Sequence, residues 1–157
     1  ANLLLQSVDK YSVQLILKKN GAVIGKNCDI ETGITFHNCI NYKNLIIGNN
    51  CHIGKNCFFD LRDKIEIGNN VVISMHCCFI THIDMSKSDL NEVYPPRQAP
   101  ITIKDNVYLG VRSTILMGIV LNENCFIAAN TLVIHNVEPN TMVGGVPANF
   151  IKKFYNI

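Results

Sequence analysis

The residues with the clearest capacity for chemistry are cysteine and histidine, and several of them crowd together in the middle of the chain. The sequence contains 7 cysteines and 5 histidines. Thiolate and imidazole groups are common ligands of zinc, so a metal site is the first hypothesis that this stretch raises. The crowded residues are Cys51, His52, Cys57, His76, Cys77 and Cys78.

His82 raises a second possibility, because it stands where a regular sequence pattern gives way to a long polar segment, 81–100. A histidine with an ordinary pKa of roughly 6.5 can take a proton from a hydroxyl group near neutral pH, as a general base does. Asp84 follows closely in sequence and could orient the imidazole ring, since a carboxylate commonly has that role. The sequence therefore offers both metal binding and acid–base catalysis.

A repeat of six residues, which pairs an aliphatic residue with a small residue four positions later, helps to separate these possibilities. A helix repeats its apolar face every 3.6 residues and a strand every 2, so a period of six predicts short strands joined by similar corners. Early units open with Ile24, Ile47, Ile53 and Ile67. Later units follow without interruption at Ile103, Leu109, Ile115, Leu121, Ile127 and Val133.

The repeat assigns most of the cysteines to the core. We call the position four residues after each aliphatic residue the fourth-step position. It needs a small buried group, and an unoxidised cysteine behaves as a small hydrophobic residue. Core packing is therefore favoured over metal binding for these thiols. The cysteines at this position are Cys28, Cys51, Cys57, Cys77 and Cys125.

Asparagine recurs at one position of the repeat. Asparagine tolerates the left-handed backbone region better than most residues, so we expect these residues to form the corners rather than to bind a ligand. They are Asn27, Asn50, Asn56, Asn70, Asn106, Asn124, Asn130 and Asn136.

Composition restricts the functional classes further. Apolar residues make up 48% of the sequence and charged residues 17%, with a net charge of +2, which predicts one globular domain. That charge gives no reason to expect a nucleic acid or an anionic membrane as partner. No apolar run reaches the roughly 20 residues that span a bilayer, and residues 1–20 lack signal-peptide features. An odd number of cysteines favours a reducing compartment, so we expect a cytoplasmic protein.

Interruptions of the repeat indicate where a site lies. If the units are grouped in threes, as coils, the coils open at Ile24, Ile47, Ile67, Ile103 and Leu121, with a remnant near Val143. Every interruption follows the third unit of a coil, so the extra residues should project from one edge of the structure. The interrupted steps run from Phe36 to Ile47, from Phe59 to Ile67, from Phe79 to Ile103 and from Val133 to Val143.

Over residues 23–147 the repeat resembles that of the hexapeptide acyltransferases. The resemblance implies an all-β fold, a left-handed parallel β-helix with three six-residue units per coil. It also implies a homotrimer with active sites between subunits, and acetyl-CoA as acyl donor with no metal required. The remaining segments are a capping helix within 1–22, suggested by the spacing of Val8, Leu15 and Ile16, a protruding loop at 81–100 and a tail at 148–157.

The same resemblance implies roles for individual residues. Ile80-Thr81-His82, the polar loop and the segment 100–110 match the galactoside, maltose and antibiotic acetyltransferases, in which a histidine before the loop is the catalytic base. The segment 60–64, with Asp60 and Arg62 as candidate acceptor-binding residues, resembles acetyltransferases of capsule and polysaccharide gene clusters. Position matching assigns the donor groove to Gly110, Ala129, His135, Gly145 and Pro147, with Lys152 and Lys153 near the donor phosphates.

Three functional hypotheses follow. The leading one is an O-acetyltransferase that modifies a sugar or polysaccharide precursor with His82 as general base. The second is an N-acetyltransferase acting on an amino sugar or an antibiotic. The third is a scaffold or metal-dependent trimer similar to γ-class carbonic anhydrases, for which His37, His76 and His82 are the candidate ligands, although their spacing differs from that class.

Overall fold

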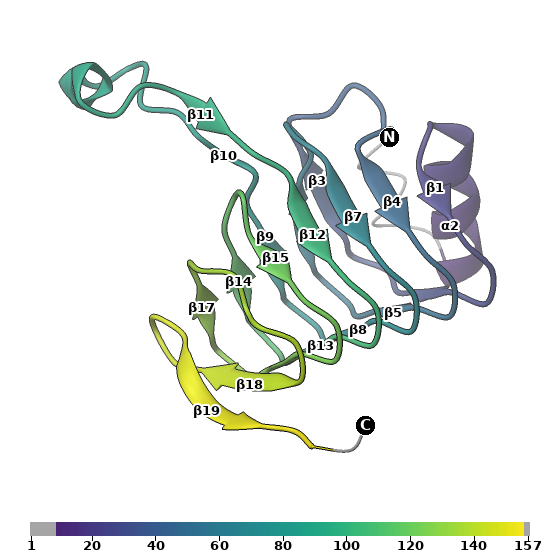
Figure 1. Ribbon diagram of the computed structural model, residues 1–157. Helices are drawn as coiled ribbons and strands as arrows, with labels where there is room; N and C mark the ends of the chain where they lie inside the picture. The colour runs from purple at the N-terminus through teal and green to yellow at the C-terminus, as the bar shows by residue number, and fades with distance from the viewer. Residues whose placement is uncertain (1–8, 156–157) are drawn as a thin grey trace.

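Three parallel β-sheets form the sides of a prism in a computed structural model that describes residues 9–155 (Figure 1). The predicted β-helix is confirmed as a solenoid of about six turns. Face A contains β1 (Val23–Ile24), β4 (Leu45–Ile47), β7 (Ile65–Ile67), β12 (Ile101–Ile103) and β15 (Val120–Leu121). Face B contains β2 (Asp29–Ile30), β5 (His52–Ile53), β8 (Val72–Ile73), β13 (Tyr108–Leu109), β16 (Phe126–Ile127), β18 (Thr141–Gly144) and β19 (Asn149–Lys153). Face C contains β3 (Thr35–His37), β6 (Phe58–Asp60), β9 (Cys78–Phe79), β14 (Thr114–Ile115) and β17 (Leu132–Val133).

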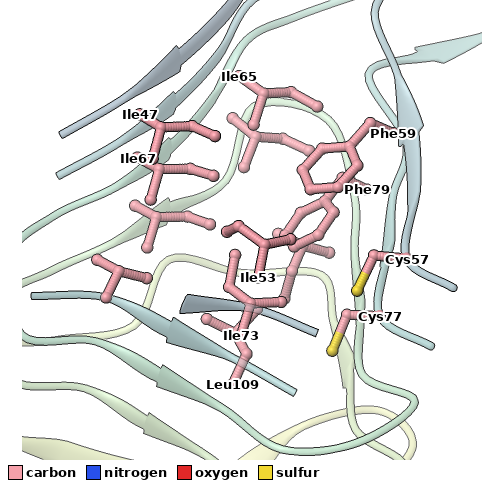
Figure 2. Close-up of a cluster of buried hydrophobic side chains, with 14 of the residues drawn as sticks. Ile47, Ile53, Cys57, Phe59, Ile65, Ile67, Ile73, Cys77, Phe79 and Leu109 are labelled. Atoms are coloured by element: carbon pink, nitrogen blue, oxygen red, sulfur yellow. The ribbon is translucent and has the colours of Figure 1, made fainter. Parts of the chain in front are cut away.

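The aliphatic positions of the repeat form the core. Ile47 pairs with Ile67 on face A, and Ile53 pairs with Ile73 on face B, so like residues stack along the prism (Figure 2). On face C the rings of Phe59 and Phe79 are stacked with centroids 4.7 Å apart. Stacking of equivalent residues on successive coils explains why the sequence keeps the period of six.

Most cysteines at the fourth-step position are buried in the core, as predicted, but their thiols also form contacts with polar groups. Cys51, Cys57 and Cys77 are buried, and each Sγ lies within 3.1–3.3 Å of a backbone carbonyl oxygen on the next coil. Cys28, on the first coil, is only partly buried. No group of three potential metal ligands occurs within residues 9–155.

Positive φ angles mark the corners. Seven of the eight asparagines predicted to be there adopt them, whereas Asn136 does not and instead accepts a hydrogen bond from the Val120 amide. Asn38 and Asn140 adopt positive φ without having been predicted. So do His76 and Arg112, which have φ of 60°.

One predicted register is wrong. Val143 pairs with Ile127 on face B, so it occupies the second position of the sixth coil and not the first. Val137 takes the first position, because it forms a bridge with Leu121. The step after Val133 is therefore shortened rather than extended, and three insertions remain on the edge between faces C and A, the CA edge.

A short helix covers the first coil, where a solenoid would otherwise expose its apolar end. Helix α2 (Lys10–Lys19) begins after Asp9, whose carboxylate accepts hydrogen bonds from the Tyr11 and Ser12 amides. Val13 and Leu17 are fully buried against the first coil, whereas Leu15 is 55% exposed, contrary to its predicted packing. Val8 lies outside the described residues.

The longest insertion forms a projecting hairpin. Strands β10 (His82–Ile83) and β11 (Arg97–Gln98) pair antiparallel at its base, and a 3-10 helix, η1 (Asp89–Glu92), lies near its tip (Figure 1). At the other end of the chain, β19 folds back antiparallel on β18. Neither helix of the described part is long and apolar enough to cross a membrane.

Candidate active site

His82 lies at the base of the hairpin, where the chain leaves face C. Its side chain is 18% exposed, and its Nδ1 atom lies 2.5 Å from Oδ2 of Asp60, which ends strand β6 on the neighbouring coil. The histidine is thus accessible from solvent on one side and fixed by a carboxylate on the other.

Asp60 is fully buried and is surrounded by hydrogen-bond donors. The Thr81 amide donates to Oδ2 at 2.9 Å, and Nδ2 of Asn38 donates to Oδ1 at 3.0 Å. Burial by itself would raise the pKa of Asp60, but the hydrogen bonds from His82, Asn38 and Thr81 outweigh it and lower the pKa to about 2. Asp60 is therefore ionised at neutral pH.

The ionised carboxylate sets the tautomer of His82. A carboxylate without a proton can only accept hydrogen bonds, so Nδ1 of His82 must be the donor toward Asp60. In the neutral ring, the lone pair then resides on Nε2. Within the described residues Nε2 has no hydrogen-bond partner, so this nitrogen is available to take a proton from a bound molecule.

Asp84, the residue expected to orient His82, does not contact it. Its carboxylate accepts hydrogen bonds from the Ser86 amide and from Nη1 of Arg62, both at 3.0 Å. Hydrogen bonds from the Ser86 amide and the Ser86 side chain, followed by one from the Arg62 guanidinium, lower the pKa of Asp84 to about 2. The turn that brings the Ser86 amide to Asp84 directs this carboxylate toward Arg62, and Asp60 takes the position beside the imidazole.

The two residues expected at the acceptor lie in different environments. Arg62 is partly exposed at the rim of the site, where it lines a pocket of about 190 Å³ together with Asn38 and Leu61. Asp60 lies beneath His82 with no exposed surface, so it is oriented toward the imidazole and not toward a bound molecule.

Asn38 and Thr81 are site residues that sequence reasoning missed. Both bond to Asp60, and Asn38 projects from the insertion that follows strand β3 on the first coil. Aligning the repeat units of neighbouring coils could have indicated this proximity. The pairing of Phe59 with Phe79 brings Asp60 close to Thr81 and His82. His37 is also nearby, with its ring centroid 6.4 Å from that of His82.

Most of the residues expected to bind the acyl donor gather at a different place, the edge between faces B and C, or BC edge. A side chain on Gly110 would approach the Ala129 amide nitrogen to 2.6 Å, so the two coils meet there without an intervening side chain. The Gly145 amide donates to Oγ1 of Thr131 at 3.3 Å, and Pro147 lies in the same turn between β18 and β19. These backbone segments form a continuous edge.

The other three expected donor-binding residues lie apart from this edge. His135 follows face C on the CA edge, and it lines a pocket of about 320 Å³ at the last coil together with Lys153. Lys152 Nζ lies 5.5 Å from the centre of the Phe154 ring. The donor-binding set is therefore divided between the BC edge and the end of the prism.

The hexapeptide repeat of this chain is shared with known proteins. The sequence model described as hexapeptide repeat of succinyl-transferase matches residues 44–75 and 100–134, which are coils of the solenoid. A solved maltose O-acetyltransferase from Clostridium difficile 630 superposes with a TM-score of 0.84 and 28% identity, covering 99% of this chain and 83% of that one. The chain carries this hexapeptide repeat and is similar to acetyltransferases that contain it.

Relatives of this hexapeptide-repeat protein act on different acceptors. The galactoside O-acetyltransferase of Escherichia coli K12 is 28% identical over 88% of this chain and 66% of its own length. The 2,3,4,5-tetrahydropyridine-2,6-dicarboxylate N-acetyltransferase of Alkaliphilus metalliredigens is 29% identical over 59% of this chain and 50% of its own length. The chain thus spans about half the length of the first curated relatives that it matches.

Proposed function

We propose that this hexapeptide-repeat protein is an acetyltransferase that moves the acetyl group of acetyl-CoA to a hydroxyl group of a saccharide. The observation that carries the proposal is the pair formed by buried, ionised Asp60 and partly exposed His82. The galactoside and maltose O-acetyltransferases support the reaction and the acceptor class. A Vibrio cholerae protein solved with acetyl-CoA has the same fold, with a TM-score of 0.83 and 23% identity.

The chemistry requires one base in the correct tautomer. Nε2 of His82 takes the proton from the acceptor hydroxyl as the oxygen attacks the thioester carbonyl. The resulting tetrahedral intermediate collapses, the carbon–sulfur bond breaks, and the CoA thiolate takes the proton back from Nε2. Asp60 stabilises the imidazolium that exists between these two steps, because it holds Nδ1–H by a charged hydrogen bond.

The position of the donor follows from the separation of the two edges. His82 lies on the CA edge, whereas Gly110, Ala129 and Gly145 lie on the BC edge at the other side of face C. One protomer alone keeps these groups apart. We propose that a homotrimer brings the CA edge of one protomer against the BC edge of the next, so that each active site takes residues from two chains.

The outward side of face C has the composition that such an interface needs. Its outward residues include large apolar side chains that are only partly buried, and apolar surface of this kind is typical of contacts between copies. They are Phe58, Cys78, Ile80, Leu116, Leu132 and Ile134.

We expect Leu132→Arg to convert a trimer into monomers and to abolish acetyl transfer. The substitution puts a charge on the outward side of β17 in the proposed interface without touching His82 or Asp60. Light scattering measures the mass, and Val120→Arg on the outward side of face A is the matched control that should remain trimeric. A wild-type protein that is monomeric at micromolar concentration would contradict the interface.

N-acetylation is the second candidate function. The relatives named as tetrahydropyridine dicarboxylate N-acetyltransferases support it, and the same base could take a proton from an amine. The choice depends on whether the acceptor presents a hydroxyl or an amino group to Nε2 of His82.

The direct test of the proposed function is thiol release from acetyl-CoA with a panel of acceptors. We expect CoA thiol to appear faster with at least one saccharide than with water alone, and mass spectrometry to place the acetyl group on an oxygen. Acetylation of amino sugars or antibiotics instead would favour the second candidate. Metal content measured on the same sample addresses the scaffold or metal-dependent alternative.

A further inference from the structure

The corners along the BC edge contain two unusual residues. Gly33, Asn56 and Asn130 hold the left-handed position on the first, second and fifth coils, as expected for residues that tolerate positive φ. On the third and fourth coils the same position is occupied by His76 and Arg112, both with φ of 60°. Histidine adopts this backbone region more often than most residues, whereas arginine is not favoured there.

Asparagine would have been the better choice for stability. At the corner between faces A and B, asparagine side chains form a continuous ladder, with Asn27 donating to Asn50 at 2.7 Å and Asn50 to Asn70 at 2.9 Å. His76 and Arg112 accept backbone strain and have no such ladder. Strained positions that the fold does not require often serve function.

The two residues stack on adjacent coils. The His76 amide donates to the carbonyl of Lys55 at 2.9 Å, and the Arg112 amide donates to the carbonyl of Met75 at 3.2 Å. The side chains of Lys55, His76 and Arg112 are exposed, and within residues 9–155 none of them has an ion-pair partner. We call these three residues the basic ridge.

Charge on this edge is otherwise sparse. In the five corners at 31–34, 54–57, 74–77, 110–113 and 128–131, Glu31 is the only acidic residue. Glu31 lies on the first coil, two coils from His76. Glu31 and Lys55 line the same pocket, whereas no acidic residue lies in the corners of His76 and Arg112, so the ridge is a strip of basic residues beside Gly110.

The ridge lies at the same height along the prism as the proposed base. His76 immediately precedes the run that leads into β9, and His82 begins β10 directly after that coil crosses face C. Arg112 precedes β14 on the next coil. In a trimer whose symmetry axis runs along the prism, the ridge of one protomer therefore faces His82 of its neighbour.

We infer that Arg112 and His76, with Lys55, bind an anionic group of the acceptor, which makes the acceptor a carboxylated or phosphorylated saccharide. The inference rests on the proposed acetyl transfer and its intersubunit site. A guanidinium group binds a carboxylate or a phosphate through two parallel hydrogen bonds, which suits a sugar acid or a sugar phosphate. The phosphates of the acyl donor are the other anions that could reach the ridge.

The test uses Arg112→Asn and His76→Asn, because asparagine fits the left-handed corner and should leave the fold intact. We expect the KM for a carboxylated acceptor to rise by roughly tenfold in Arg112→Asn, as for loss of a charged hydrogen bond, and to change far less for an uncharged acceptor. Lys26→Ala, which removes one exposed positive charge at a different corner, is the control and should behave as wild type. A rise in the KM for acetyl-CoA in place of the acceptor would overturn the inference.

Binding provides a readout that does not depend on catalysis. Calorimetry in the presence of CoA compares tetragalacturonate, a carboxylated saccharide, with uncharged maltotetraose. We expect wild type to bind tetragalacturonate more tightly and Arg112→Asn to lose that preference. Equal binding of both saccharides by wild type, or an unchanged preference in the variant, would overturn the inference. Arg112-dependent binding without any thiol release would instead overturn only the proposed function.

Mixed trimers test whether the ridge serves the neighbouring His82. Equal amounts of His82→Ala and Arg112→Asn protomers are coexpressed, and turnover is measured at acceptor concentrations well below KM. If each site combines His82 of one protomer with Arg112 of another, about a quarter of the sites contain both wild-type residues and activity is about a quarter of wild type. If both residues come from one protomer, activity falls to about a twentieth, which would overturn the intersubunit placement.

Discussion

Replacing His82 with alanine is expected to lower kcat by about 10²- to 10⁴-fold, the usual contribution of a positioned general base. The loss follows because Nε2 of His82 is the group proposed to take the acceptor proton, and Asp60 has no exposed surface from which to replace it. Steady-state kinetics with a confirmed acceptor measure the effect. The KM for acetyl-CoA should change little, since the donor is proposed to lie along the BC edge.

Stability separates lost chemistry from lost folding. His82 is outside the aliphatic core, so His82→Ala should still fold and remain trimeric, although it should unfold at a somewhat lower temperature because buried Asp60 loses one hydrogen-bond donor. His52→Ala is the matched control, because His52 is a partly exposed histidine on face B that pairs with Asp29. Wild-type turnover in His82→Ala would show that the base is a different residue, and His37 and His135 would be examined next.

Replacing Asp60 with asparagine should cost nearly as much activity and should destabilise the fold more than His82→Ala does. An asparagine there can accept from the Thr81 amide or donate to Nδ1 of His82, but the atom beside both groups cannot do both. Donation to Nδ1 forces the proton onto Nε2 and removes the base. We expect kcat to fall by about 10²- to 10⁴-fold, by analogy with the Asp→Asn change in the serine-protease triad.

The pH dependence of unfolding gives an independent signature of Asp60. Its pKa of about 2 in the folded protein lies below the ordinary value of 3.8, so the unfolded chain binds the proton more readily. The stability that ionised Asp60 contributes, about 2 kcal/mol, is therefore fully present above pH 4 and is lost as the pH falls toward 2. Denaturant titrations between pH 5 and 2 should show a shallower decline in Asp60→Asn than in wild type. Parallel curves would mean that Asp60 is not ionised as described.

The fold could be predicted from sequence because the same rule repeats in every coil. Each aliphatic position has an equivalent residue one coil away, so the period of six reports a spatial contact directly. The rule fails where a corner is shortened. The repeat therefore predicts Val143 as the first position of the sixth coil, whereas Val137 occupies that position in the structure. A repeat pattern alone does not distinguish a shortened corner from a lengthened one.

The candidate base could be found from sequence, but its partner could not be assigned correctly. Proximity in sequence suggested Asp84, whereas the carboxylate beside His82 belongs to Asp60 on the neighbouring coil. Which of two acids faces an imidazole depends on local turns, and the turn at Ser86 directs Asp84 toward Arg62. The number of residues between two groups does not encode such a direction.

The hairpin that follows His82 is largely independent of the stacked coils. It is joined to the prism through one pair of short strands, and all of its residues between Ile83 and Arg97 lie outside the ladder of stacked coils. Changing the length of such a loop costs little, about 0.6 kcal/mol for each doubling. The hairpin can therefore change in length and sequence between homologues with little effect on the stability of the scaffold that carries the base.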